Sequence, residues 1–106
     1  MGRLKEKVAI ITGGGGGIGR ATAIRFAEEG ARVIVAEINT DLGEESAQLA
    51  RDAAGNSGGD AVFIETDVTS HESVKNAVSE AVERYGKLDI LHNNAGGSTM
   101  QDGPVT

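Results

Sequence analysis

A run of glycines near the start of the chain has the residue type and the position of an anion-binding turn. Gly13 to Gly17 are followed by Ile18 and Gly19, and they lie between the apolar segment Val8 to Thr12 and a segment patterned like a helix. Glycine lets the backbone adopt positive φ and approach a ligand closely, while a helix N-terminus presents unpaired N–H groups and a partial positive charge. The run therefore predicts a cradle for a pyrophosphate.

The glycine run fits two spacings at once. Gly14, Gly16 and Gly19 match G-x-G-x-x-G, whereas Gly13, Gly17 and Gly19 match G-x-x-x-G-x-G. Because the glycines are consecutive, the run itself matches both registers. The choice between them depends on motifs elsewhere in the chain.

An acidic residue follows the glycine run at the spacing that is typical of dinucleotide-binding folds. Glu37 comes eighteen positions after Gly19, close to the ~20 residues at which a dinucleotide-binding fold places an acid against the adenosine ribose. A carboxylate there accepts hydrogen bonds from ribose hydroxyls and repels a 2′-phosphate through charge. Ile38 follows the acid and Gly16 precedes Gly17, so no cation is evident to hold that phosphate. This pattern favours NAD over NADP, the alternative being a solvated acid at a strand end.

A second acid, Asp67, stands in the sequence Thr66-Asp67-Val68 after another apolar segment. Its side chain could accept a hydrogen bond from an adenine amino group, or it could cap the helix that follows. The residues alone leave both roles open.

The elements that must position these residues alternate along the chain. Apolar, β-branched segments predict strands at Val8 to Thr12, Arg32 to Glu37, Ala61 to Thr66 and Leu88 to Asn93. Helical spacing predicts helices at Ile18 to Glu29, Asp41 to Ala54 and Glu72 to Tyr85. Each helix ends at a glycine, namely Gly30, Gly55 and Gly86, where a left-handed residue is favoured. Thr69 to Glu72 has the pattern of a capping box for the third helix.

This βαβαβαβ alternation requires right-handed crossovers and a parallel sheet covered by helices. We predict the first half of a three-layer, Rossmann-type doubly wound α/β fold with strand order 3-2-1-4. The first and fourth strands are then neighbours, and a crevice lies at their carboxyl ends. Thr12 and Asn93 end these two strands, so the glycine run and the segment after Asn93 converge there.

Composition bounds the possible functions. A chain of 106 residues with 39% hydrophobic residues can bury one core. It has no cysteine, which excludes a disulfide framework and a thiolate metal site, and we predict no metal site. The formal net charge of -6 argues against nucleic acid as a partner. No apolar segment could act as a signal or cross a bilayer, so we expect no membrane partner. The absence of cysteine fits a reducing compartment, and we expect the cytoplasm.

Taken together in their order, four motifs resemble those of the short-chain dehydrogenase/reductase family. They are Thr12-Gly13-x-x-x-Gly17-Ile18-Gly19, Glu37, Asp67-Val68 and Leu88-Asp89-x-x-x-Asn93-Asn94-Ala95-Gly96. The resemblance covers nearly the whole chain and implies the G-x-x-x-G-x-G register and NAD as cofactor. By position it implies a cofactor site made of Gly13, Gly17, Ile18, Gly19, Glu37, Asp67, Val68, Asn94, Ala95 and Gly96. Two residues depart from the common family pattern: Glu6 stands where many members have glycine, and His92 where an aliphatic residue is common.

The resemblance also implies an activity. Family members are NAD(P)-dependent oxidoreductases that transfer hydride between the cofactor and a small-molecule alcohol or carbonyl, and they assemble as homo-oligomers, dimers or tetramers. Their acid or base is a tyrosine followed four residues later by lysine, together with a serine. The only tyrosine here is Tyr85, and Asp89 stands four residues on, so we expect Tyr85 to be structural. We assign no catalytic residue and expect residues 1–106 to be an NAD-binding domain truncated before the catalytic segment.

Two alternatives remain. A non-catalytic nucleotide-binding or sensing module would keep the same fold and cradle. An adenosylmethionine-dependent methyltransferase shares the glycine-rich turn and an acid after the second strand, but it gives the segment Asn93 to Gly96 no role.

Overall fold

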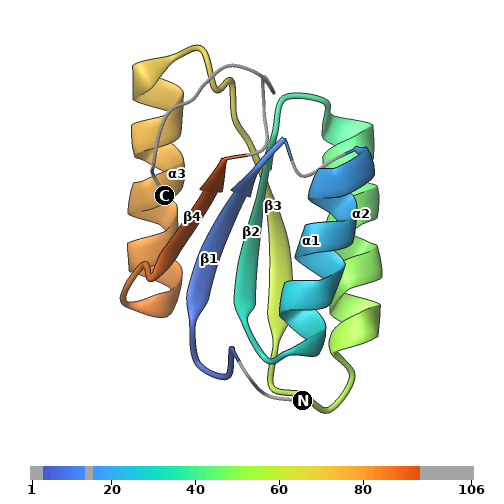
Figure 1. Cartoon of the computed structure of the whole chain (residues 1–106). Coiled ribbons are helices and arrows are strands. Elements are labelled where there is room, and N and C mark those ends of the chain that lie inside the picture. Colours follow the sequence, from blue (N-terminus) through green and yellow to red (C-terminus); the bar gives the residue numbers. More distant parts are fainter. Residues whose placement is uncertain (1–3, 14–15, 94–106) are drawn as a thin grey trace.

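The computed structural model describes residues 4–13 and 16–93. Four parallel strands form one sheet: β1 (Val8–Thr12), β2 (Arg32–Glu37), β3 (Asp60–Glu65) and β4 (Ile90–Asn93). Three helices connect them: α1 (Gly17–Glu28), α2 (Thr40–Ala54) and α3 (His71–Tyr85). The strand order is β3-β2-β1-β4 (Figure 1). The predicted order 3-2-1-4 and the βαβαβαβ alternation are confirmed.

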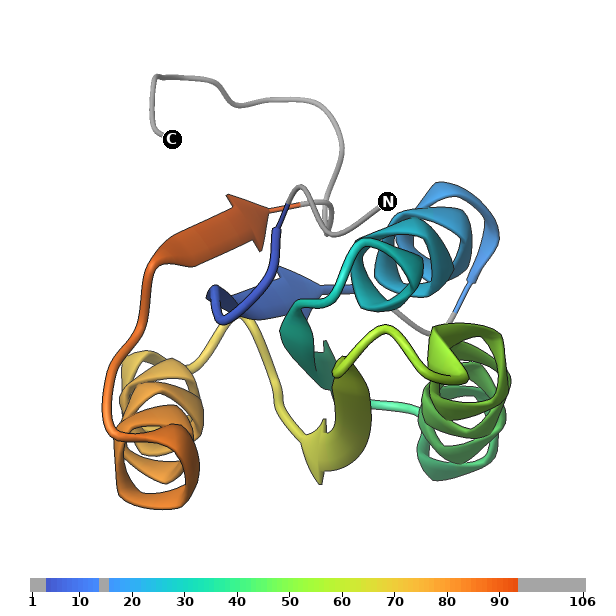
Figure 2. The same cartoon turned by 90° about the horizontal axis from the view of Figure 1, so that it is seen from below.

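The helices cover the two faces of the sheet unequally. Viewed along the molecule, α1 and α2 lie side by side on one face and α3 lies on the other (Figure 2). This is the three-layer arrangement that right-handed crossovers produce when the chain reverses its direction of winding. The reversal falls between β1 and β4, which are neighbours in the sheet.

The central strands are apolar because both of their faces are covered. All five residues of β1 are buried, and so are Val33 to Ala36 of β2. Such continuous burial favours β-branched residues and gives no alternation of polar and apolar positions. The core on the side of α1 and α2 is rich in alanine, including Ala23, Ala27, Ala47 and Ala50. The short side chains let these helices lie close to the sheet.

The strand boundaries differ slightly from the predicted ones. β3 begins one residue early, at Asp60, and ends at Glu65. β4 begins at Ile90 instead of Leu88. The reason is visible at Asp89, whose backbone N–H donates to Val8 O while its carboxylate accepts from the Val8 N–H at 2.9 Å. At the start of the β1–β4 pairing, the Asp89 side chain thus accepts the Val8 N–H in place of a backbone carbonyl.

The predicted capping box of α3 is wrong. The helix begins at His71, and its N-cap is Ser70, whose side chain accepts from the Ser73 N–H at 3.2 Å. Thr69 lies one residue before this cap, and its hydroxyl donates to Asp67. The three predicted helix-terminal glycines, Gly30, Gly55 and Gly86, do have positive φ, at 98°, 49° and 85°.

Glu6 has a backbone conformation that disfavours its side chain. Its φ is 67°, and no other non-glycine residue in the described part of the chain has positive φ. Lys7 N–H donates to Leu4 O, so Glu6 is the third residue of a tight turn, the position at which a positive φ calls for glycine. The Glu6 departure noted in the sequence therefore coincides with a strained position.

Within residues 4–13 and 16–93, no helix is both long enough and apolar enough to span a membrane.

Candidate functional site

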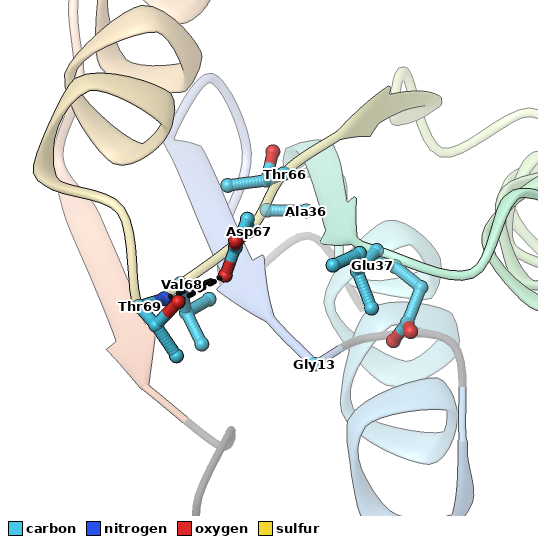
Figure 3. A pocket seen from close by; sticks show the side chains of 8 residues that line it. Gly13, Ala36, Glu37, Thr66, Asp67, Val68 and Thr69 are labelled. Atoms are coloured by element: carbon cyan, nitrogen blue, oxygen red, sulfur yellow. Dashed lines mark hydrogen bonds between the residues drawn. The ribbon is translucent and has the colours of Figure 1, made fainter.

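A cleft of about 240 Å³ opens at the carboxyl edge of the sheet, above β1, β2 and β3. Figure 3 shows its walls, which come from the ends of three strands and the loops that follow them. The lining residues are Gly13, Ala36, Glu37, Ile38, Thr66, Asp67, Val68 and Thr69. Four of the ten predicted cofactor residues therefore lie around one cleft, and they come from three separate segments of the chain.

The glycine turn begins beside this cleft. Gly13 follows β1 with φ 64°, and its N–H donates to Ala36 O at 2.8 Å. Gly17, the first residue of α1, has φ 40°. Gly16 between them is extended, with φ -131° and ψ 156°, and an added Cβ there would meet no atom within 4 Å. The backbone thus requires glycine at two of the positions in the G-x-x-x-G-x-G register, whereas Gly16 has an ordinary conformation.

The N-terminus of α1 has no side-chain cap. Gly16 is its N-cap and has no side chain to bond the first N–H groups, and the first turn contains no acidic residue. Gly19 is buried, while Ile18 is 75% exposed. Uncapped N–H groups with the positive end of the helix dipole behind them favour a negatively charged ligand.

Glu37 ends β2 and is held by the start of the next helix. The Asn39 N–H donates to Glu37 Oε2 at 3.0 Å, and Asn39 Oδ1 accepts from the Leu42 N–H at 2.9 Å as the N-cap of α2. The carboxylate is therefore oriented by a backbone segment that the helix cap itself fixes.

Asp67 is held in a similar way after β3. Its Oδ1 accepts both the Thr69 N–H, at 2.9 Å, and the Thr69 hydroxyl, at 2.6 Å. These hydrogen bonds, led by that from the hydroxyl, keep the pKa of Asp67 below its usual value. Since Ser70 caps α3, the alternative role of Asp67 as helix cap is wrong.

Thr12 and Asn93 join the ends of β1 and β4, as their predicted adjacency requires. Thr12 Oγ1 donates to Asn93 Oδ1 at 2.8 Å and also lies 3.4 Å from His92 O. The remaining predicted cofactor residues, Asn94, Ala95 and Gly96, lie outside the described residues.

Four lining residues are not predicted as site residues by the sequence: Ala36, Ile38, Thr66 and Thr69. In the sequence, Ile38 matters only as a position without Lys or Arg. In the structure its side chain is 58% exposed and lines the cleft together with Val68, which is 39% exposed. An apolar residue directly after each strand-end acid was the available signal, because ligand pockets are lined mostly by apolar side chains with a few polar groups.

Tyr85, His71 and His92 do not line the cleft. Tyr85 Oη donates to Asp60 Oδ2 at 3.1 Å, and Asp60 begins β3, so the phenol lies at the amino edge of the sheet, opposite the cleft. Burial, followed by the charge and hydrogen bond of Asp60, raises the pKa of Tyr85 to about 12. The His92 ring packs edge-on against Phe26, and His71 is exposed at the start of α3. In the described part of the chain, no cluster of acidic or imidazole side chains could hold a metal ion.

Comparison with known proteins gives one consistent result. The family model described as short chain dehydrogenase matches residues 7–105. An uncharacterized oxidoreductase of Thermotoga maritima is 48% identical over 92 residues, which cover 87% of this chain and 34% of that protein. Tropinone reductase-like 1 of Erythroxylum coca is 46% identical over 104 residues, covering 98% of this chain and 36% of that protein. The chain thus spans about a third of the length of the curated relatives it matches.

Solved structures agree with the sequence relatives. A 7α-hydroxysteroid dehydrogenase, complexed with NADH and 7-oxo glycochenodeoxycholic acid, superposes with a TM-score of 0.74 at 43% identity. The match covers 90% of this chain and 36% of the other. Glucose dehydrogenase of Caenorhabditis elegans gives a TM-score of 0.76 at 41% identity, covering 91% of this chain and 40% of the other.

Proposed function

The chain belongs to the short-chain dehydrogenase family, and on that basis we propose that it forms the dinucleotide-binding part of an NAD-dependent oxidoreductase. The reaction is hydride transfer between the nicotinamide and a small-molecule alcohol or carbonyl. The observation that carries this proposal is the cleft in which Gly13, Glu37, Asp67 and Val68 lie together. A related structure that contains NADH supports the same cofactor class.

The residues present fit a dinucleotide in their chemistry. Gly13, Gly17, Ile18 and Gly19 would hold the pyrophosphate at the uncapped N-terminus of α1. Glu37 would accept hydrogen bonds from the adenosine ribose, and Asp67 with Val68 would border the adenine. We assign Asn94, Ala95 and Gly96 to the cofactor by the family motif alone.

The size of the cleft fits one part of a dinucleotide better than the whole molecule. About 240 Å³ is below the range of roughly 300–1,000 Å³ in which a whole drug-sized ligand is enclosed. The cleft would therefore hold one end of the dinucleotide, the adenosine end, while the rest extends past the glycine turn.

The preference for NAD over NADP rests on charge. The Glu37 carboxylate lines the cleft, and none of its eight lining residues is cationic. A 2′-phosphate placed beside Glu37 would face a like charge with no Lys or Arg in the lining to compensate it, and like charges about 4 Å apart repel each other by up to ~4 kcal/mol at an intermediate dielectric. We therefore assign NAD as the cofactor.

The roles of the chain's own residues in the reaction are binding and orientation. When bound, the cofactor supplies the hydride acceptor or donor. The residues described above would hold the adenosine and pyrophosphate, and so would orient the cofactor relative to the sheet. Tyr85 is excluded as the acid or base, because it lies at the opposite edge and its pKa is raised instead of lowered. We assign no catalytic residue within these 106 residues.

We propose that residues 1–106 act as one NAD-binding domain, and that the protein is a cytoplasmic homo-oligomer, dimer or tetramer, as its family implies. Size-exclusion chromatography with light scattering on the natural protein would measure the oligomeric state.

Isothermal titration calorimetry with NADH and NADPH tests the central proposal. We expect the natural full chain to bind NADH at least about tenfold more tightly than NADPH. Equal or tighter binding of NADPH would remove the role assigned to Glu37, and absence of binding by either dinucleotide would contradict the proposal as a whole.

A further inference from the structure

Both acids of the cleft are oriented by the backbone two residues further along the chain. Glu37 accepts the N–H of Asn39 at 3.0 Å, and Asp67 accepts the N–H of Thr69 at 2.9 Å. The Thr69 hydroxyl also donates to Asp67, at 2.6 Å. Figure 3 shows this link on one wall of the cleft.

The two Thr69 donors reach the same oxygen. Both bonds end on Asp67 Oδ1, and among the residues that the structure describes no donor reaches Oδ2. A carboxylate fixed through one oxygen has its second oxygen in a defined direction. Without that restraint the terminal torsion of an aspartate is broad.

We propose that Thr69 is a positioning residue that fixes Asp67 Oδ1, so that Oδ2 faces the cleft as the acceptor for the exocyclic amino group of the bound base. This inference rests on the proposed function, because it assumes that the adenine of a dinucleotide occupies the cleft. It adds a selectivity to that function: the cleft distinguishes a base with a 6-amino group from one with a 6-oxygen in the same place.

The chemistry of the pair supports this role. A carboxylate that keeps its charge is acceptor-only, so it attracts an amino group and repels a carbonyl oxygen. The Thr69 hydrogen bonds favour that charged form by lowering the pKa of Asp67. Preorganising the acceptor also lowers the entropy lost when the base binds.

A purely structural role for the hydroxyl is less consistent with its surroundings. Ser70 and not Thr69 caps α3, and the Thr69 to Asp67 contact is exposed to solvent. Exposed hydrogen bonds contribute little to folding, so removing this hydroxyl should change ligand discrimination more than stability.

The test compares NADH with deamino-NADH, which carries hypoxanthine in place of adenine, by calorimetric titration of the natural full chain. We expect the unmodified protein to prefer NADH by at least about tenfold, the effect of losing one hydrogen bond to a charged group. Thr69→Val should lower this preference to about threefold or less, whereas Thr69→Ser, which keeps the hydroxyl, should retain it. Asp67→Ala defines the preference that remains without the acceptor.

Thr22→Val is the matched control. It makes the same chemical change at a hydroxyl that bonds Ile18 O within α1, so the preference for NADH should stay at the unmodified value. Thr69→Ala provides a second hydroxyl-free variant, and circular dichroism melts report whether each variant folds.

The outcomes separate the two proposals. If the unmodified protein binds neither dinucleotide, the proposed function fails and the inference fails with it. If it binds NADH and both hydroxyl-free Thr69 variants keep its preference over deamino-NADH, only the positioning role is overturned. Equal binding of the two dinucleotides by the unmodified protein would also overturn it, since Asp67 would then not contact the amino group.

Discussion

The hydroxyl of Thr12 donates a 2.8 Å hydrogen bond to the side-chain carbonyl of Asn93, although the two residues are separated by 81 positions in the chain. The bond joins the carboxyl ends of β1 and β4, the pair of strands between which the direction of winding reverses. It also lies directly before the glycine turn, so it links the packing of the sheet to the geometry of the candidate site.

Replacing Thr12 with valine should therefore destabilise the protein. Thr12 is 5% exposed, and Thr12→Val keeps its shape while removing the donor to Asn93. We expect a loss of about 1 kcal/mol in the free energy of unfolding, measured by urea denaturation of the natural protein. Thr12→Ser, which keeps the hydroxyl, should lose less than Thr12→Val; the reverse order would show that packing of the methyl group outweighs the hydrogen bond.

Removing the charge of Glu37 should broaden cofactor use. Glu37→Gln keeps the shape of the side chain but no longer repels a 2′-phosphate. The affinity for NADPH relative to NADH should rise at least about tenfold, measured by calorimetry. Glu83→Gln, the same change at an exposed position of α3, should leave the ratio unchanged. An unaltered ratio in Glu37→Gln would mean that the carboxylate does not face the ribose.

Alanine substitutions can distinguish the two glycine registers. Gly17 has φ 40°, whereas Gly16 is extended with open space where a Cβ would lie. Gly17→Ala should cost about 1–2 kcal/mol of stability, while Gly16→Ala should change stability by less than about 0.5 kcal/mol. Thermal melts of both variants provide the measurement. Equal losses would contradict the backbone conformation of the turn.

Burial of Tyr85, together with the charge and hydrogen bond of Asp60, should make stability depend on pH in the alkaline range. The pKa of Tyr85 is raised in the folded state to about 12, above an ordinary value of about 10. The folded state therefore holds the phenol proton more tightly, and this contribution is complete below pH ~10 and is lost as the pH rises towards ~12.

Tyr85→Phe removes both the hydrogen bond and the titration. At pH 7 the variant should be less stable by about 1 kcal/mol. The difference from the unmodified protein should shrink between pH ~10 and ~12, as followed by urea denaturation at several pH values. Because Tyr85 lies at the amino edge of the sheet, NADH binding at pH 7 should be unchanged, and a loss of binding would contradict its assignment as structural.

Glu6 offers a substitution that should stabilise the fold. Its φ of 67° costs an L-residue roughly 1–2 kcal/mol, of which glycine would recover all but the ~0.5–1 kcal/mol of extra chain entropy. Glu6→Gly should therefore raise stability by up to about 1.5 kcal/mol, as measured by urea denaturation. Lys5→Gly, at the preceding turn residue, should lower stability, because there only the entropy term applies.

Sequence patterns predicted the fold closely where a single strong signal determined it. β1 and β2 begin and end where predicted, because unbroken apolar runs flanked by turn residues mark fully buried strands. The capping box failed because two neighbouring hydroxyl residues can each cap this helix, and in the fold Ser70 is the cap while the Thr69 hydroxyl donates to Asp67. The contact with Asp67 is not encoded in the local pattern, so Thr69 was not predicted as a site residue.

The start of β4 could not be predicted for a related reason. The residues from Leu88 onward carry a strand pattern, yet the first contact with β1 is made by the carboxylate of Asp89. Whether a side chain or a carbonyl takes the Val8 N–H depends on how two distant segments meet, and no periodicity along the chain encodes that. Family resemblance supplied the cofactor positions, and four of them lie around the cleft.

The parallel pairing of the sheet has a consequence for how quickly the protein can fold. Val8 pairs with Arg32, but Ala9 pairs with Ile90 at the far end of the chain. Closing the larger loop costs more chain entropy before any contact compensates for it, so high contact order slows the reaction. We expect β1, α1 and β2 to form the nucleus and β4 to dock last, in a late transition that Asp89 and Asn93 complete.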